Sequence, residues 1–474
     1  MVVTKHFYGF HMARSHVITQ WDPEDTVAWK AGNDKIARRN LIWSTVAEHA
    51  GFSIWSIWSV MVLFMPESVY GFSAGDKFLL AATATLAGGV LRIPYSLATA
   101  AFGGRNWTIF SALVLLIPTV AMMGLLAHPG LPLWPYLVCA ALTGLGGGNF
   151  AASMTNVNAF YPHRLKGWAL AVNAGGGNLG VPLIQLVGLA VLATVGNRQP
   201  YWVCAIYLVF LAFAAIGAAL FMDNLDSQKA DLTAMRSILP ELDTWIVALL
   251  YIGTFGSFIG FSFAFGQVLQ ISFVGSGQSP AQASLHAAQI AFLGPLLGSL
   301  SRIFGGRLAD RLGGSRVTLA AFGGLFAASG LLVGVSTLDS NSTGPTTGAV
   351  MVGYVIGFVA LFIVSGIGNG SVYKMIPSVF EARSHRMGMP ESDRRHWARA
   401  MSGALIGFAG AVGALGGVGI NLALRQSYIT SGSATTAFWI FLVGYVGAAA
   451  LTWLRYVRRP FFATQPARAA LAPA

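Results

Sequence analysis

Residues 306–314 read Gly-Arg-Leu-Ala-Asp-Arg-Leu-Gly-Gly, a short charged stretch that joins two long apolar runs. The run that ends in this stretch covers residues 284–309, and the next covers residues 315–337. Each run is long enough for a membrane-spanning helix, which needs about 20 residues. We therefore predict a tight loop between two membrane spans.

The composition of the whole chain agrees with a membrane protein. Of its 474 residues, 55% are hydrophobic and 10% are charged, and the mean hydropathy is +0.64. Soluble domains carry about 25% charged residues, so a soluble enzyme or binding module is excluded. Glycine is abundant without a collagen period, which favours close helix packing in lipid. Cys139 and Cys204 both lie in apolar runs, so neither a disulfide framework nor a cysteine metal site is indicated.

Twelve apolar runs are present, and the positive charges fall in alternate connections between them. No short apolar segment with a cleavage site precedes the first run, so we expect no cleaved signal peptide. The net charge of +12 is spread over these loops instead of forming a basic domain, which argues against nucleic-acid binding. Cytoplasmic loops are enriched in Lys and Arg, so we predict a multi-pass protein of the cell (inner or plasma) membrane with both termini cytoplasmic. The runs are 41–65, 78–102, 107–127, 134–160, 167–195, 201–222, 243–271, 284–309, 315–337, 348–378, 400–424 and 436–457.

The chain contains an internal repeat at an offset of 210 residues. Arg92 and the glycine pair 103–104 recur as Arg302 and the pair 313–314. Repeated six-helix halves are typical of transporters, with the substrate site between the halves. We predict an all-α polytopic membrane protein built as two six-helix halves. The expected division is a cytoplasmic segment 1–40, a first half 41–222, a central cytoplasmic loop 223–242, a second half 243–457 and a cytoplasmic tail 458–474.

Arg92 and Arg302 lie deep inside their spans. Each precedes its glycine pair by eleven residues, which is roughly 16 Å of helix in a hydrocarbon core about 30 Å thick. Each buried arginine costs roughly 2.5–3.5 kcal/mol on insertion scales. The spans contain almost no acidic residues that could pair with them. Two cations without counter-charges predict an anion site, and the planar guanidinium suits a flat oxyanion.

Glu48 and Lys374 are also charged residues inside predicted spans. Glu48 is the one carboxylate inside the first run; it is either an acid near the cytoplasmic surface, which we favour, or a proton carrier. Lys374 lies near the inner end of span ten, where a lysine can also simply extend to the surface.

The loop at 306–314 resembles the loop signature of the major facilitator superfamily, which takes part in gating and contains Asp310 here. The copy after span two, residues 102–105, lacks the aspartate. Residues 167–180 and 407–421 are rich in glycine and resemble the paired nitrate signatures of the nitrate/nitrite porter family within that superfamily. Residues 148–154, 251–262 and 368–376 resemble the same family.

The resemblance implies a transporter that moves nitrate or nitrite by alternating access, without a cofactor, a metal or catalytic residues. It implies that Arg92 and Arg302 hold the anion, that Tyr251 donates a hydrogen bond, and that Phe150 and Phe255 lie above and below it. Ordinary helix packing is the alternative explanation for the aromatic residues. The partners expected are nitrate, nitrite and membrane lipid, and we expect a monomer. Further residues that the resemblance places at the pocket or in the signatures are Asn178, Ala174, Tyr373, Gly175, Gly177, Gly413 and Gly417.

The sequence leaves the coupling mode open. Bound anion would offset the repulsion between the arginines, which favours nitrate/nitrite exchange. Residues 21–25 and 36–41 resemble the proton-symport branch, for which Glu48 is the available carboxylate. Three other functions remain as alternatives: a carrier for another small anion such as formate or a carboxylate, an anion sensor, and a membrane-embedded enzyme. We find no metalloprotease, P-loop or nucleophile-elbow motif for the last.

Overall fold

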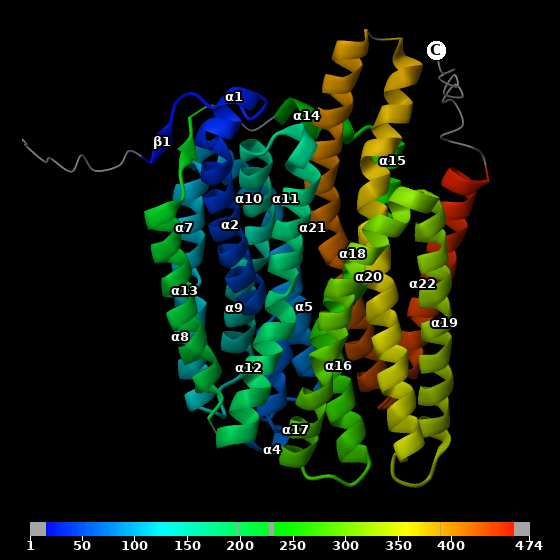
Figure 1. Ribbon diagram of the computed structural model, residues 1–474. Coiled ribbons are helices and arrows are strands. Elements are labelled where there is room, and N and C mark those ends of the chain that lie inside the picture. Colours follow the sequence, from blue (N-terminus) through cyan, green and yellow to red (C-terminus); the bar gives the residue numbers. More distant parts are fainter. Residues whose placement is uncertain (1–15, 197–198, 227–231, 389, 459–474) are drawn as a thin grey trace, which may run out of the picture.

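The computed structural model describes residues 16–196, 199–226, 232–388 and 390–458. These residues form a bundle of long helices (Figure 1). Among them, twelve helical segments are long and apolar enough to cross a membrane, which confirms the predicted all-α polytopic architecture. The segments are Thr26–Phe64, Ala74–Phe102, Gly104–Ala127, Leu133–Phe160, Arg164–Val195, Tyr201–Phe221, Leu242–Gly275, Pro280–Leu312, Gly314–Asn341, Gly348–Ser384, Asp393–Ser431 and Thr435–Val457.

Several spans are interrupted by short breaks, so one span often holds two helices. The first half contains α1 (Thr26–Ala28), α2 (Asp34–Trp55), α3 (Trp58–Met61), α4 (Glu67–Tyr70), α5 (Ala74–Val90), α6 (Arg92–Phe102), α7 (Gly104–Val114), α8 (Leu116–Ala127), α9 (Leu133–Thr143), α10 (Leu145–Phe160), α11 (His163–Asn178), α12 (Gly180–Val195) and α13 (Tyr201–Phe221). The remainder contains α14 (Leu232–Ile238), α15 (Leu242–Tyr251), α16 (Ser257–Gly275), α17 (Pro280–Ala291), α18 (Leu293–Leu312), α19 (Gly314–Asn341), α20 (Gly348–Ser384), α21 (Glu391–Ser431) and α22 (Thr435–Thr452).

Several helices begin or end at residues other than those at which the predicted apolar runs begin or end. Helix α2 begins at Asp34, so the expected boundary at residue 40 does not mark the start of the helix. Helices α20 and α21 extend past the predicted ends of their spans and project beyond the other helices (Figure 1). Hydropathy marks only the part of a helix that lies in lipid, whereas the polar ends remain helical. Arg198, Lys229, Asp231 and nearly all of the expected tail 458–474 lie outside the described residues.

Glycines let helices approach closely in both halves. A side-chain carbon added to Gly146 of α10 would lie 2.1 Å from the backbone oxygen of Gly51 in α2. One added to Gly366 of α20 would lie 2.2 Å from the backbone oxygen of Gly298 in α18. Both distances are shorter than any contact that such a carbon tolerates, so only glycine fits. Both glycines therefore act in helix packing.

The two halves are joined by hydrogen bonds on the face opposite α1 and α14. Gln267 of α16 donates to the backbone oxygen of Ala74 (2.8 Å), and Gln270 donates to that of Leu63 (3.2 Å). Ser284 of α17 also donates to Leu63 (2.7 Å), and Gln185 of α12 donates to the backbone of α16 (3.0 Å). All four donor side chains are buried. This face is therefore closed.

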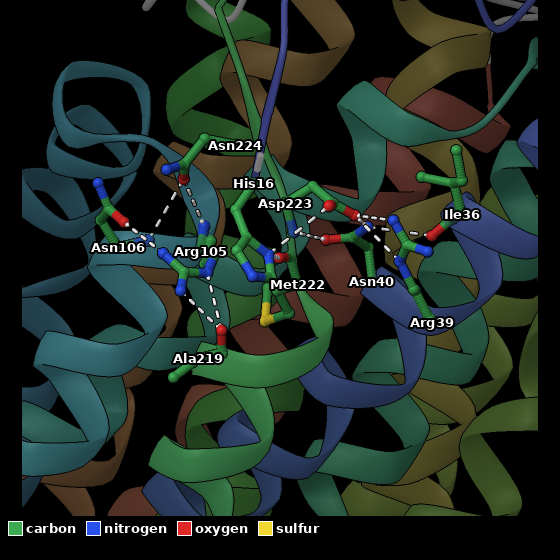
Figure 2. Close-up of polar contacts among 10 residues, drawn as sticks. All are labelled: His16, Ile36, Arg39, Asn40, Arg105, Asn106, Ala219, Met222, Asp223 and Asn224. Atoms are coloured by element: carbon green, nitrogen blue, oxygen red, sulfur yellow. Dashed lines mark hydrogen bonds and ion pairs between the residues drawn. The ribbon is translucent and has the colours of Figure 1, made fainter. Parts of the chain in front are cut away.

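The N-terminal segment pairs with the residues that follow the sixth span. Strand β1 (Val17–Ile18) pairs in parallel with β2 (Asn224–Leu225). Figure 2 shows the buried Asp223 carboxylate, which accepts hydrogen bonds from Arg39 (2.6 Å) and Asn40 (3.0 Å). The side-chain oxygen of Asn224 accepts from the backbone N–H groups of Arg105 (3.0 Å) and its neighbour at the start of α7. The described part of the segment before the first apolar run is thus held against the start of the central loop.

Candidate anion-binding site

Arg92 is the first residue of α6, directly after the break that separates it from α5. Its side chain is 1% exposed. Its Nε donates to the backbone oxygen of Gly147 (3.3 Å), and its Nη1 donates to that of Gly410 (2.7 Å), which belongs to the opposite half. Its Nη2 is buried and has no hydrogen-bond partner within the described structure. One donor of the guanidinium is therefore available to a ligand.

Aromatic rings surround the Arg92 guanidinium. Its central carbon lies 4.7 Å from the ring centre of Phe150 and 4.8 Å from that of Phe255. Trp55 and Phe52 lie at 5.3 Å and 5.8 Å. Cation–π attraction to several rings offsets part of the free energy of burying this charge.

Arg302 lies in the middle of α18, in the second half. Its Nη2 lies 3.4 Å from the hydroxyl oxygen of Tyr251, and its guanidinium lies 5.1 Å from the ring centre of Tyr373. Its Nη1 is buried and lacks a hydrogen-bond partner within the described structure. Among the described residues, no carboxylate lies within salt-bridge distance of Arg302 or Arg92. Each half therefore contributes one arginine without an acidic partner and with one unused donor.

Tyr251 and Phe255 lie where span seven departs from regular α-helix. Tyr251 ends α15, and a π-helical turn, Ile252–Gly256, follows it. The rings of Tyr251 and Phe255 stack with an interplanar angle of 5° and centres 5.1 Å apart. Gly413 of α21 lies against Tyr251, since an added side-chain carbon would come within 2.4 Å of the ring. π-Helical turns occur often at functional sites, and this one presents two rings to the arginines.

Glu48 is fully buried, so the favoured interpretation of it as an acid near the surface is wrong. Its Oε2 accepts hydrogen bonds from the Ser153 hydroxyl and from Asn173 Nδ2 (2.5 Å). Its Oε1 is buried without a partner within the described structure. Glu48 lies one helical turn before Phe52, whose ring contacts Arg92, so the carboxyl group is about 6 Å along the helix from the arginine layer.

The glycines of the nitrate signatures have different surroundings. A side-chain carbon on Gly177 would lie 2.0 Å from Glu48 Oε1, so this glycine makes room for the carboxyl group. One on Gly417 would lie 2.8 Å from the Thr85 methyl group. A carbon on Gly175 would meet nothing within 4 Å. Close packing therefore explains Gly177 and Gly417 but not Gly175.

The other predicted residues lie around this centre or away from it. Asn178 is buried at the end of α11 with its side-chain oxygen unpartnered in the described structure, and Ala174 is buried one turn earlier. Neither makes a contact with the arginines that the structure records. Asp310 pairs with Lys374 (2.9 Å) at the surface, where both side chains are about half exposed. The structure thus brings together the two arginines, Tyr251, Tyr373, Phe150, Phe255 and Gly413.

Three residues at the centre were not predicted from the sequence: Phe52, Trp55 and Gly410. The two aromatic residues lie three apart in span one, a spacing that places them on one helix face but is equally common in ordinary packing. Gly410 is one of many glycines in residues 407–421, and nothing in the sequence distinguishes it from the others.

A cavity of about 300 Å³ leads from Arg92 and Phe150 toward the face that carries α14. It is lined by both halves and reaches Met235 of α14 and Arg399 of α21. A second cavity of about 880 Å³ shares Arg399 and continues between α11 and the ends of α20 and α21. The site is therefore open toward one face of the bundle and closed toward the other.

Comparison with known proteins agrees with this arrangement. Residues 49–390 match the model of the Major Facilitator Superfamily. The chain is 34% identical over 467 residues to the nitrate/nitrite transporter NarU of Salmonella typhimurium, covering 94% of this chain and 97% of that protein. It is 32% identical to the probable nitrate/nitrite antiporter NarK2 of Thermus thermophilus, covering 94% and 98%.

Solved structures show the same fold. The nucleoside transporter NupG has a TM-score of 0.60 at 12% identity, covering 88% of this chain and 98% of its own. The D-xylose-proton symporter has a TM-score of 0.60 at 14% identity, covering 88% and 97%. The resemblance read from the sequence is confirmed: the chain belongs to the nitrate/nitrite transporter family of the major facilitator superfamily.

Proposed function

We propose that this chain transports nitrate and nitrite across the cell membrane by alternating access, with the anion bound between Arg92 and Arg302. The observation that supports this most directly is one buried, unpartnered guanidinium nitrogen on each arginine, one from each half. The names of the relatives supply the substrate class. Residues of a single chain form the whole site, so a monomer suffices.

Each group at the site has a distinct role in holding the anion. The two guanidinium groups donate charge-assisted hydrogen bonds to its oxygens, and their planar geometry matches a planar anion. The Tyr251 hydroxyl, already near Arg302, is a further donor. The rings of Phe150 and Phe255 exclude water, which strengthens every electrostatic interaction at the site.

The charges also suggest why transport proceeds by exchange. A bound anion reduces the repulsion between the two arginines, so the halves can close around it. Without the anion, two like charges must approach each other in a medium of low dielectric constant, which disfavours reorientation. In the structure the Arg92 Nη1 bonds the Gly410 carbonyl across the interface, which also holds the halves in one arrangement. A loaded carrier then crosses more readily than an empty one.

The site assignment is tested by uptake of labelled nitrate in proteoliposomes loaded with nitrite. We expect Arg92→Ala and Arg302→Ala each to cost about 2–5 kcal/mol of anion binding, which reduces uptake at low substrate more than about 30-fold. Arg38→Ala removes an exposed arginine of α2 and is the matched control, with uptake unchanged. Full uptake by both site variants would refute the assignment.

Glu48 supports a second coupling mode, proton-driven nitrate uptake. It is a buried carboxyl group with one unpartnered oxygen, one helical turn from the arginine layer. A proton carrier needs a titratable group of this kind near the path. In vesicles without internal nitrite, an imposed pH gradient should drive uptake by the wild type and not by Glu48→Gln, whereas Glu67→Gln, at an exposed position, should behave as wild type. If the wild type shows no uptake under these conditions, proton coupling is refuted and anion exchange is the coupling mode.

The distribution of Lys and Arg supports an orientation with both termini in the cytoplasm. The open face, which carries α14, is then cytoplasmic, and the structure is an inward-open state. The orientation can be tested with single cysteines introduced at Lys35 and at Val69, which are exposed at opposite faces. The cysteines are labelled in cells with a reagent that does not cross the membrane. Labelling at residue 69 and not at residue 35 is expected. Competition of formate and carboxylates against nitrate uptake tests whether another small anion is the substrate.

A further inference from the structure

The two cavities on the open face are continuous, and Arg399 of α21 lies where they join. In the cavity of about 300 Å³, the described lining contains two charged residues, Arg92 and Arg399, and no carboxylate. Arg399 is also the only charged residue among the six that line both cavities, which are Asn158, Leu170, Arg399, Ala400, Gly403 and Ile406. An anion that moves from the arginine site toward the face with α14 therefore passes Arg399.

The wider cavity, of about 880 Å³, has a positively charged lining. Four of its described lining residues are lysine or arginine, and two are glutamate, one of which pairs with Arg395. His385 adds a positive charge when it is protonated. The charged residues are Lys166, Glu381, Glu391, Arg394, Arg395 and Arg399. Because a cleft lined mainly by one sign of charge raises the local concentration of counter-ions, this cavity favours anions.

Lys166 and Arg399 come to this cavity from opposite halves. Lys166 is half-buried near the start of α11, and Arg399 is exposed on α21. Their positive charges are close enough to repel each other, whereas Glu24, which lines neither cavity, attracts Lys166. The arrangement is similar to that of Arg92 and Arg302, since each half contributes one cation to a shared space.

Arg399 lies at a different level from the central arginines. It precedes Gly410, whose carbonyl oxygen accepts the hydrogen bond from Arg92, by eleven residues of α21, which is about 16 Å of helix. The Debye length in physiological salt is about 8 Å, so the central charges are largely screened at that distance in water. An anion in the wider cavity is therefore attracted mainly by the cations of that cavity.

We propose that Arg399 and Lys166 form a second, outer binding site for the transported oxyanion, between the solution and the site at Arg92 and Arg302. The inference rests on the proposed function. Guanidinium and ammonium groups both donate charge-assisted hydrogen bonds to oxyanions. Because Arg399 is exposed to water, the outer site binds more weakly than the central one. It supplies anions to the narrower cavity without retaining them.

The test measures the local preference for anions beside Arg399, with a cysteine introduced at Ala400, which lines both cavities. The buried Cys139 and Cys204 are replaced, and the full chain is purified in detergent. An anionic and a cationic methanethiosulfonate reagent then react with the cysteine, and each rate is divided by the rate with a free thiol in solution. We expect the anionic reagent to be favoured about tenfold. Nitrate, exchanged for gluconate at constant ionic strength, should slow the anionic reagent at least about threefold.

Variants of Arg399 separate its charge from its shape. Arg399→Gln should abolish both the preference for the anionic reagent and the protection by nitrate, whereas Arg399→Lys should keep both. Arg316→Gln is the matched control, because it removes the same charge from an exposed position at the start of α19 that lines neither cavity. The variant Arg92→Ala/Arg302→Ala should also keep the protection by nitrate, since the outer site is separate from the central one.

The outcomes distinguish this inference from the proposed function. Loss of preference and protection in Arg399→Gln, with both retained in the lysine and control variants, supports the outer site. Equal rates of the two reagents in the starting protein, or protection that persists in Arg399→Gln, would overturn it. Protection lost in Arg92→Ala/Arg302→Ala would also overturn it, because nitrate would then act from the central site. None of these measurements depends on transport, whereas absence of nitrate and nitrite transport by the wild type would overturn the proposed function itself.

Discussion

Closure of the face opposite α14 depends on a small number of side chains whose contribution can be calculated. Gln267 and Gln270 of α16 each donate one hydrogen bond to the backbone of the first half. Both side chains are buried, and both bonds must break if this face is to open. Truncation of both to alanine removes these bonds and leaves a small cavity, and each effect weakens the closed arrangement.

The magnitude follows from the value of a buried hydrogen bond. Each contributes about 0.5–1.5 kcal/mol net, so the double variant loses about 1–3 kcal/mol of closed-state stability. That free energy corresponds to a shift of about 5- to 150-fold in the ratio of the two states. The backbone acceptor at Leu63 keeps its bond from Ser284, so no acceptor there is left without a donor.

The assay is a distance measurement across the closed face. The buried Cys139 and Cys204 are first replaced. Spin labels are then attached to cysteines introduced at Val69 and Thr343, which are exposed on this face in opposite halves. The distance between the two labels reports whether the face opens. We expect a longer distance population to grow in Gln267→Ala/Gln270→Ala. Gln278→Ala is the control, because Gln278 bonds His286 within the same half. An unchanged distance distribution in the double variant would refute the reasoning.

Three further predictions follow from single contacts. Gly177→Ala should reduce nitrate uptake and thermal stability, because its methyl group would overlap the carboxyl group of Glu48 at a cost of about 1–3 kcal/mol, whereas Gly175→Ala, in open space, should change neither. Asn224→Ala removes the cap of α7 and should lower the free energy of unfolding in detergent by about 1 kcal/mol; unchanged thermal unfolding would contradict that role. Lys374→Gln breaks an ion pair between half-exposed side chains, worth at most about 1 kcal/mol, so uptake should remain within about twofold of wild type, and a large loss would show that the pair controls gating.

The fold could be predicted from the sequence because lipid imposes a strong constraint. Every span needs an apolar run, and the loops need charge on one side, so twelve runs with alternating Lys and Arg define the architecture. The arginines could be placed at depth because a glycine pair marks the end of each span and eleven helical residues give a length. These features depend only on local sequence and helix geometry.

The burial of Glu48 could not be predicted from its place in the first span. Its apolar run begins near residue 41, which suggests a position close to the surface. Its burial depends on Asn173 and Gly177, which approach from another helix. Such tertiary contacts leave no periodic signal in a single sequence.

The pairing of β1 with β2 sets an order for biosynthesis. Residues 17–18 leave the ribosome first, yet their partners at 224–225 follow the sixth span. The segment cannot reach its final position until the whole first half has been synthesised. Once paired, the beginning and the end of that half are held together by a contact that requires no residue of the last six helices.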